Sequence, residues 1–215
     1  PVAPGPQADD ALADATAAPQ APARNGRLVL LYASPLCYET ASGPKPIAQL
    51  PVEKEYEAVI SAHKHASHKL QVESAFSGVR KHGPGALISA QTLTAASLQR
   101  ALTRSPNAYS GAAPATVLHL SAHGFGDRIV LEDGRCSAHF LGCDTLRDML
   151  ALGGSRAYSP TRLVVLNACS LRQVGLLFAE VGVPHVICCK SELLDKASHV
   201  FLEAFYSYLF EGGTV

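Results

Sequence analysis

The chain has 215 residues, of which 47% are hydrophobic and 17% charged, a composition that supports a sizeable core and excludes general disorder. Its 18 Lys and Arg residues balance 18 Asp and Glu residues, so no charge excess indicates a surface for nucleic acid or an anionic membrane. No apolar run approaches the roughly 18 residues that a transmembrane helix needs.

Residues 1–26 form a lead-in rich in Pro and Ala. They have neither a positively charged start nor a clean apolar core, so a signal peptide is not predicted. The segment lacks the apolar surface needed to order itself and is interpreted as a disordered linker, with one domain over residues 27–215. Because the chain has no initiator Met, we interpret it as one module of a longer polypeptide.

The domain begins with an apolar run, RLVLLYA from Arg27, that predicts a buried strand. The next segment, SPLCYETASGPKP, is expected to be a loop because its prolines and glycine break regular elements. Helical spacing then predicts a helix over about 51–70. Its histidines, His63, His65 and His68, suggest a metal site, but lysines alternate with them and no acidic partner is suitably spaced. A solvated basic face is therefore favoured.

The rest of the chain continues the alternation of strands and helices. In order, we expect a strand at 85–91, a helix at 92–103, a strand at 116–121, a hairpin at 129–134, a helix at about 139–152, a strand at 163–166, a helix at 171–181, a strand at 184–189 and a helix at 191–211. Thr92 or Thr94 would cap the first of these helices, and Gly182 would end the third. This alternation predicts a doubly wound, mainly parallel α/β sheet flanked by helices.

The stretch TRLVVLNACS, residues 161–170, combines a buried strand with a cysteine at its end. Ser170 and Gln173 fit a capping box that would start the following helix at once. Cys169 would then lie near the positive end of that helix, a position that favours the thiolate form of a cysteine. A cysteine in such a place is, taken alone, more often simply a buried side chain.

A second stretch of the same build, TVLHLSAHG at residues 116–124, changes that balance. It ends in His123 and Gly124, and chemistry in open α/β sheets gathers outside the carboxyl ends of the strands. Neighbouring strands that end in His123 and Cys169 would place a base beside a nucleophile, as thiolate catalysis requires. The two stretches together therefore favour a catalytic cysteine.

Several motifs in the same order resemble the CHAT domain, a caspase-like cysteine peptidase module that is also akin to separases. They are LLYASP, SAHG, IVLEDG, LVVLNACS, AEVGVPHVI and FYSYLFEGG, and the resemblance covers nearly all of the chain from residue 27 to the last residue. The spacing of 46 positions from His123 to Cys169 is close to the about 50 seen in caspases. The resemblance implies a caspase-like fold, a His123–Cys169 dyad, and an oxyanion hole lined by the amides of Gly124 and Cys169.

In such a site the Cys169 thiolate attacks the scissile carbonyl and His123 protonates the leaving amine, with no metal or organic cofactor. The resemblance also implies a protein or peptide substrate and regulatory helical repeats in the same polypeptide. Asp195 falls where family members carry an acidic residue. It is a candidate substrate-binding residue for a basic side chain before the cut bond, or else it only stabilises the first turn of its helix. Asn167 is expected to hydrogen-bond backbone at the strand end.

Two departures from the family leave the function open. CHAT members often have several more residues between the Cys and the next helix, and they usually continue into one more helix than this chain, which stops at Val215. We therefore expect either an active cysteine endopeptidase or a caspase-like scaffold that keeps the dyad but serves as an interaction module in signalling. A nucleotide-binding domain is disfavoured because both glycine-rich phosphate motifs are missing.

The six cysteines show no CxxC pair and no framework spacing, so neither zinc nor a redox dithiol is favoured. They are Cys37, Cys136, Cys143, Cys169, Cys188 and Cys189. We expect reduced thiols and a cytoplasmic location, with no nucleic acid or membrane partner.

Overall fold

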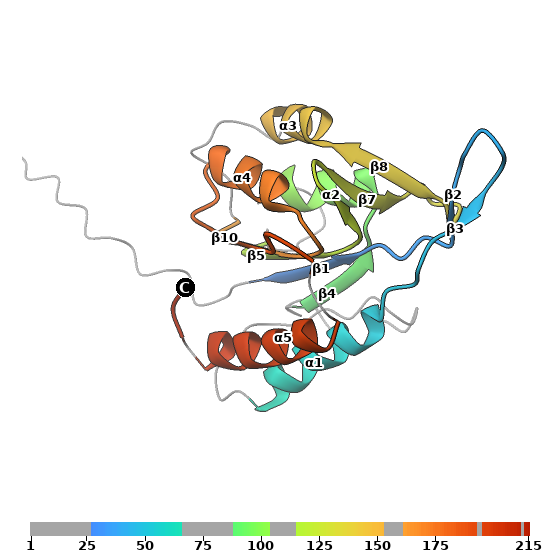
Figure 1. Ribbon diagram of the computed structural model, residues 1–215. Coiled ribbons are helices and arrows are strands. Elements are labelled where there is room, and N and C mark those ends of the chain that lie inside the picture. Colours follow the sequence, from blue (N-terminus) through green and yellow to red (C-terminus); the bar gives the residue numbers. More distant parts are fainter. Residues whose placement is uncertain (1–26, 66–87, 104–114, 153–160, 193–194, 212) are drawn as a thin grey trace, which may run out of the picture.

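The computed structural model describes residues 27–65, 88–103, 115–152, 161–192, 195–211 and 213–215 (Figure 1). The expected linker at 1–26 lies outside these ranges, as do His68 and the start of the strand predicted from residue 85. Within the described ranges, no helix has both the length and the apolar character to cross a bilayer.

Five parallel strands form the central sheet, in the order β4-β1-β5-β9-β10. They are β1 (Leu28–Tyr32), β4 (Ile88–Thr92), β5 (Val117–Ser121), β9 (Leu163–Asn167) and β10 (His185–Cys188). Numbered along the chain, the order is second, first, third, fourth and fifth, which is a common doubly wound arrangement. The predicted parallel sheet and the five predicted strands are confirmed.

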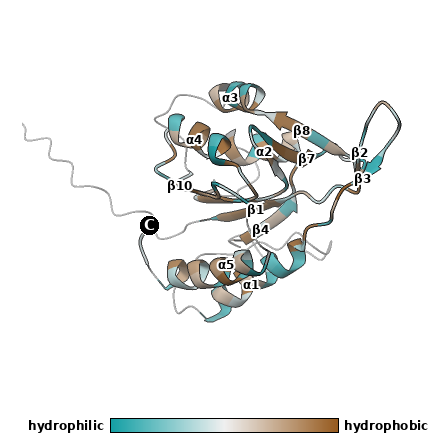
Figure 2. Ribbon diagram, viewed as in Figure 1, coloured by the Kyte–Doolittle hydropathy of each residue, from teal (hydrophilic) through white to brown (hydrophobic). Residues whose placement is uncertain are grey.

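Helices cover both faces of this sheet (Figure 1). The pair α1 (Val52–His65) and α5 (Asp195–Phe210) packs on one face, and α2 (Ala95–Thr103), α3 (Cys143–Leu152) and α4 (Arg172–Glu180) pack on the other. Figure 2 shows the central strands as mostly hydrophobic, because β1, β5 and β9 in the middle of the sheet bury side chains on both faces.

Two small antiparallel sheets lie beside the central one. The strands β2 (Cys37–Tyr38) and β3 (Lys45–Pro46) pair within the segment predicted to be a loop. The second sheet has three strands, β6 (Gly124–Phe125), β7 (Arg128–Glu132) and β8 (Ala138–Gly142). The predicted hairpin is thus confirmed and is longer than expected.

The helix predicted from residue 139 begins at Cys143 instead, so the prediction was wrong for residues 139–142. These residues belong to β8 and pair with β7, with His139 opposite Leu131 and Leu141 buried against the core. Pairing with a neighbouring strand therefore overrides the local helical pattern.

Thr94 caps α2, as predicted. The Ser97 amide donates to Thr94 Oγ1 at 3.1 Å, and the Thr94 amide donates to Ser97 Oγ at 2.8 Å. These reciprocal hydrogen bonds satisfy donors that the first turn of a helix leaves open.

The capping box predicted for α4 is wrong. Ser170 has a positive φ of 55°, and its amide donates a hydrogen bond to the Ser191 carbonyl at 3.2 Å. The helix begins at Arg172, with Leu171 as N-cap and no side-chain capping bond. The chain turns at Ser170 because that residue joins the segment after β9 to the segment after β10. Gly182, with φ 98°, ends the helix as predicted.

The end of α1 forms the expected solvated basic face only in part, since Lys64 and His65 are exposed and His63 is half-buried. The His63 ring packs edge-on against Phe210 of α5 with centroids 5.3 Å apart. His65 Nδ1 lies 2.7 Å from the Ser61 carbonyl oxygen. Among the described residues, no group of His, Cys, Asp and Glu side chains is placed to hold a metal ion.

Candidate active site

The two strands predicted to carry the dyad are adjacent and parallel. Ser121 at the end of β5 lies opposite Asn167 at the end of β9, and the Ala122 amide donates to the Asn167 carbonyl at 3.4 Å. His123 and Cys169 each follow two residues later, at the carboxyl edge of the sheet. The adjacency predicted from the two apolar runs is confirmed.

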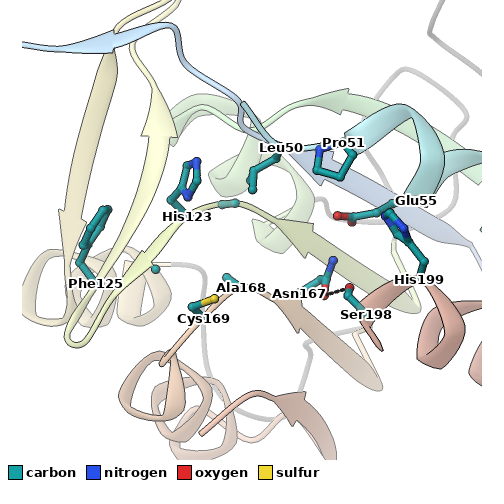
Figure 3. Close-up of a pocket in the computed structure, with 12 residues that line it drawn as sticks. Leu50, Pro51, Glu55, His123, Phe125, Asn167, Ala168, Cys169, Ser198 and His199 are labelled. Atoms are coloured by element: carbon teal, nitrogen blue, oxygen red, sulfur yellow. Dashed lines mark hydrogen bonds between the residues drawn. The ribbon is translucent and has the colours of Figure 1, made fainter. Parts of the chain in front are cut away.

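His123 and Cys169 line the same open cleft (Figure 3), which has a cavity volume of about 140 Å³. The cleft is lined by Leu50, Pro51, Glu55, Ala122, His123, Gly124, Phe125, Asn167, Ala168, Cys169, Ser198 and His199. Its walls come from the loop before α1, the ends of β5 and β9, and the first turns of α5.

A backbone carbonyl orients the His123 ring. His123 Nε2 lies 2.7 Å from the Ala48 carbonyl oxygen, and a carbonyl only accepts hydrogen bonds. Nε2 therefore carries the proton in this contact, which leaves Nδ1 as the basic nitrogen. A base that is itself held by a third group is the arrangement that activates a nucleophile in covalent catalysis.

Side chains fix the loop that presents the Ala48 carbonyl. The Leu50 amide donates to Ser34 Oγ at 3.0 Å, and Gln49 Nε2 donates to the Pro35 carbonyl at 2.9 Å. The loop is thus tied to the segment that follows β1. Sequence analysis missed Ala48 because a backbone carbonyl leaves no trace in residue identity.

Gly124 allows the His and Cys segments to approach each other. A Cβ added at Gly124 would collide with the Cys169 carbonyl oxygen, and it would lie 2.7 Å from Leu171 Cγ. Only glycine fits this contact, because the two backbones touch there. The residues expected to supply the oxyanion-hole amides, Gly124 and Cys169, are therefore in direct contact.

Asn167 has a different partner from the one expected. Ser198 Oγ donates to Asn167 Oδ1 at 2.6 Å, so this side chain ties the end of β9 to α5 rather than to nearby backbone. Asp195 is the first residue of α5, and its side chain lies outside the described part of the structure. Its predicted role in substrate binding stays a prediction.

A buried polar cluster adjoins the cleft and was missed from the sequence. His119, 1% exposed, has Nδ1 2.8 Å from Tyr206 Oη and Nε2 3.5 Å from Glu55 Oε2. Burial, and then the charge of Glu55, raises the pKa of the Tyr206 hydroxyl well above its usual value, so this group stays protonated and can donate. One signal was available: Glu55 shares a helical stripe with Val59 and Ala62, both buried.

The six cysteines are all thiols. Burial is the main cause that raises the pKa of the Cys143, Cys188 and Cys189 thiols, and the charges of Cys169 and Cys188 add to the effect at Cys189. These three groups therefore hold their protons more firmly than an exposed cysteine does.

A parallel sheet covered on both faces, with His and Cys in one cleft at adjacent strand ends, defines the chain as a caspase-like α/β module. Residues 8–215 match the family model of the CHAT domain, and the chain belongs to the CHAT domain family. The resemblance noted from the motifs is therefore confirmed. The match begins at residue 8, within the segment interpreted as a linker, so the domain boundary at residue 27 stays a prediction. No curated protein matches the chain.

Proposed function

We propose that this domain is a cysteine endopeptidase of the caspase-like type, with His123 and Cys169 as its catalytic dyad. The observation that carries the proposal is that both side chains line one cleft, at the ends of the adjacent strands β5 and β9. Membership of a caspase-like family supports the same chemistry. The proposed mechanism uses protein side chains and water alone.

In the proposed reaction, His123 Nδ1 takes the proton of the Cys169 thiol, and Sγ attacks the carbonyl carbon of the scissile peptide bond. The carbonyl oxygen takes the negative charge, which the amides of Gly124 and Cys169 would stabilise. His123 gives a proton to the amine as the C–N bond breaks, leaving a thioester on Cys169. Water, deprotonated by His123, then attacks the thioester and releases the carboxylic acid and the thiol.

The alternative is a scaffold that binds a protein without cutting it. Only Ser170 and Leu171 separate Cys169 from the first residue of α4, so this segment offers few atoms to shape a substrate groove. This alternative keeps the cleft intact but predicts no hydrolysis of a bound peptide. Regulation by helical repeats of the same polypeptide, a cytoplasmic location and a signalling role belong to the proposal and rest on family membership alone.

The test is hydrolysis of a fluorogenic peptide library by the wild type, Cys169→Ala, His123→Ala and Cys136→Ala. Cys136 is exposed and lies away from the cleft, so its variant is the matched control. We expect the two dyad variants to lose at least about a thousandfold in kcat/KM and the control to match the wild type. Equal hydrolysis by the wild type and Cys169→Ala would contradict the proposal, and wild-type binding without cleavage would favour the scaffold.

A further inference from the structure

We propose that Glu55 forms a subsite for a cationic side chain, Arg or Lys, on the substrate residue just before the cut bond. The inference rests on the proposed peptidase function and gives it a substrate class. It assigns specificity to α1, whereas the sequence pointed to Asp195 on α5.

Glu55 is a buried carboxylate at the cleft. It is the fourth residue of α1, is 6% exposed, and lines the cleft that also contains Cys169 and His123. Glutamate is almost never this buried unless it is paired, because its charge loses the solvation of water. In Figure 3 its carboxylate lies at the end of the cleft away from Phe125, with His123 and Cys169 between them.

Within the described residues, one oxygen of the Glu55 carboxylate has no hydrogen-bond donor. Glu55 Oε2 is buried and makes no hydrogen bond there, and its ion-pair contact is with His119 Nε2 at 3.5 Å. His119 Nδ1 lies 2.8 Å from Tyr206 Oη, so the other ring nitrogen, Nε2, is the one that faces Glu55. His119 Nε2 is also buried without a hydrogen bond in this part of the structure, so its contact with Glu55 does not satisfy the carboxylate.

The walls of the cleft suit a long aliphatic side chain that ends in a cation. Leu50, Pro51, Ala122 and Ala168 give apolar surface between the dyad and Glu55. Arg and Lys pack their methylene stems on such surface while the charged end reaches a polar group. Of the described residues that line the cleft, none is Lys or Arg, so a permanently charged partner for Glu55 at this site would come from the ligand.

The position before the cut bond follows from the same cavity. Cys169 and Glu55 line one cavity, so we assign this space to the side chain of the residue whose carbonyl Cys169 would attack. The competing explanation is a purely structural pair of Glu55 with His119, or with His199, which also lines the cleft. That explanation predicts no preference for a charged substrate.

The experiment compares three peptides that differ only at the residue before the cut bond: Arg, its neutral isostere citrulline, and Leu. Cleavage is measured with the wild type, Glu55→Gln, Asp195→Asn and Glu57→Gln. Glu57 is an exposed carboxylate on the same helix, so its variant is the matched control. Binding of uncleaved peptides is measured by fluorescence anisotropy in Cys169→Ala, with and without Glu55→Gln, so that the subsite is tested even without turnover.

We expect the wild type to cleave the Arg peptide about ten- to a hundredfold better than the citrulline peptide, and Glu55→Gln to remove that ratio, since a charge-assisted contact supplies it. Hydrolysis of the Leu peptide should change less than about threefold in Glu55→Gln, and Glu57→Gln should behave as the wild type. Cys169→Ala should show the same preference in binding. The comparison of Arg with citrulline needs no variant, so it holds even if Glu55→Gln fails to fold.

Equal cleavage or equal binding of the Arg and citrulline peptides by proteins that contain Glu55 would overturn the subsite. So would a preference that survives Glu55→Gln and disappears in Asp195→Asn. Cleavage of the Leu peptide alone would support the proposed peptidase function and reject the subsite for a cationic side chain. Binding that prefers Arg and depends on Glu55, but without turnover, would support the subsite and reject the peptidase.

Discussion

The two faces of the central sheet are built differently. Under α2, α3 and α4 the core is an apolar cluster centred on residues such as Leu118, Leu166 and Phe178, and the buried Arg27 and Ser89 are hydrogen-bonded to each other at 3.1 Å. Under α1 and α5 the apolar cluster is interrupted by polar side chains. They are Glu55, His119, Ser121 and Ser198, and they gather where β5 and β9 reach the cleft.

The difference indicates that the apolar face of the sheet mainly supplies stability and that the polar face mainly supplies the functional site. The apolar face gains its stability from close packing, and each side chain there is replaceable by another of similar volume. Most of the buried side-chain atoms that make no hydrogen bond within the described residues lie on the polar face or at the cleft: Glu55 Oε2, His119 Nε2, Ser121 Oγ and His199 Nε2, against Arg27 Nε on the apolar face. Such atoms are rare in protein interiors and are expected where a ligand binds. The predictions below test this separation.

The largest effect on stability should come from the apolar face. Phe178 of α4 is fully buried, so Phe178→Ala should lower the free energy of unfolding by about 3–5 kcal/mol. Ser198→Ala, on the other face, removes one hydrogen bond to Asn167 and should lower it by only about 1 kcal/mol. Urea unfolding measures both. A larger loss for Ser198→Ala would show that the polar face carries the stability.

A change at Gly124 should affect both properties, because this residue lies where the faces meet. The Cβ of Gly124→Ala collides with the Cys169 backbone, so the two strand ends must move apart. We expect a stability loss of about 1–3 kcal/mol, as for other overpacked sites. Hydrolysis should fall at least about tenfold in the folded fraction, because the dyad geometry shifts. Gly142→Ala, where a Cβ meets no atom within 4 Å, is the comparison for hydrolysis. Unchanged activity in Gly124→Ala would contradict the contact.

Tyr206→Phe tests the polar face by pH. The folded protein raises the pKa of the Tyr206 hydroxyl above its unfolded value of 10.0, so the associated stability is present below pH 10 and is lost as the pH rises beyond it. The wild type should therefore lose more stability than Tyr206→Phe between about pH 9 and 11. At pH 7 the variant should be less stable by about 1–3 kcal/mol, because His119 loses its partner. Thermal unfolding of the wild type and the variant at about pH 7, 9 and 11 measures both effects. An equal loss of stability in the two proteins between about pH 9 and 11 would contradict the prediction.

The smallest effect concerns the other cysteines. Cys188 and Cys189 lie at the end of β10, and burial raises the pKa of both thiols, so iodoacetamide at neutral pH should label them more slowly than the exposed Cys136. The difference should be several-fold and should disappear on unfolding in urea. Mass-spectrometric mapping measures the rates. Labelling of Cys188 as fast as that of Cys136 in the folded protein would contradict the partial burial of this thiol.

The parallel sheet was predictable because its central strands are buried on both faces, which gives short continuous apolar runs such as Leu163–Asn167. The same runs end just before His123 and Cys169, so the candidate dyad could be found from the sequence as well. Helix starts were harder to predict. At Ser170 the local sequence fits a capping box, but the Ser170 amide instead donates a hydrogen bond to the Ser191 carbonyl. The sequence does not reveal this contact between two segments.

The acidic end of the cleft was not found because a glutamate in an amphipathic helix is ordinarily a surface residue. The spacing of Glu55 with Val59 and Ala62 placed it on the buried face, and that signal went unused. His119 gave a second signal, as the polar residue inside the apolar run of β5. The Ala48 carbonyl gave none, since its role depends on where a loop lies after folding.

The central claim is that Cys169 is a nucleophile activated by His123. The most direct measurement is intact and peptide-mapped mass spectrometry of the protein treated with peptidyl acyloxymethyl ketones that carry Arg or Leu next to the reactive group. The account predicts one adduct, on Cys169, formed at least about tenfold more slowly in His123→Ala and absent in Cys169→Ala. Adducts on Cys37 or Cys136 instead, or equal rates in the wild type and His123→Ala, would contradict it.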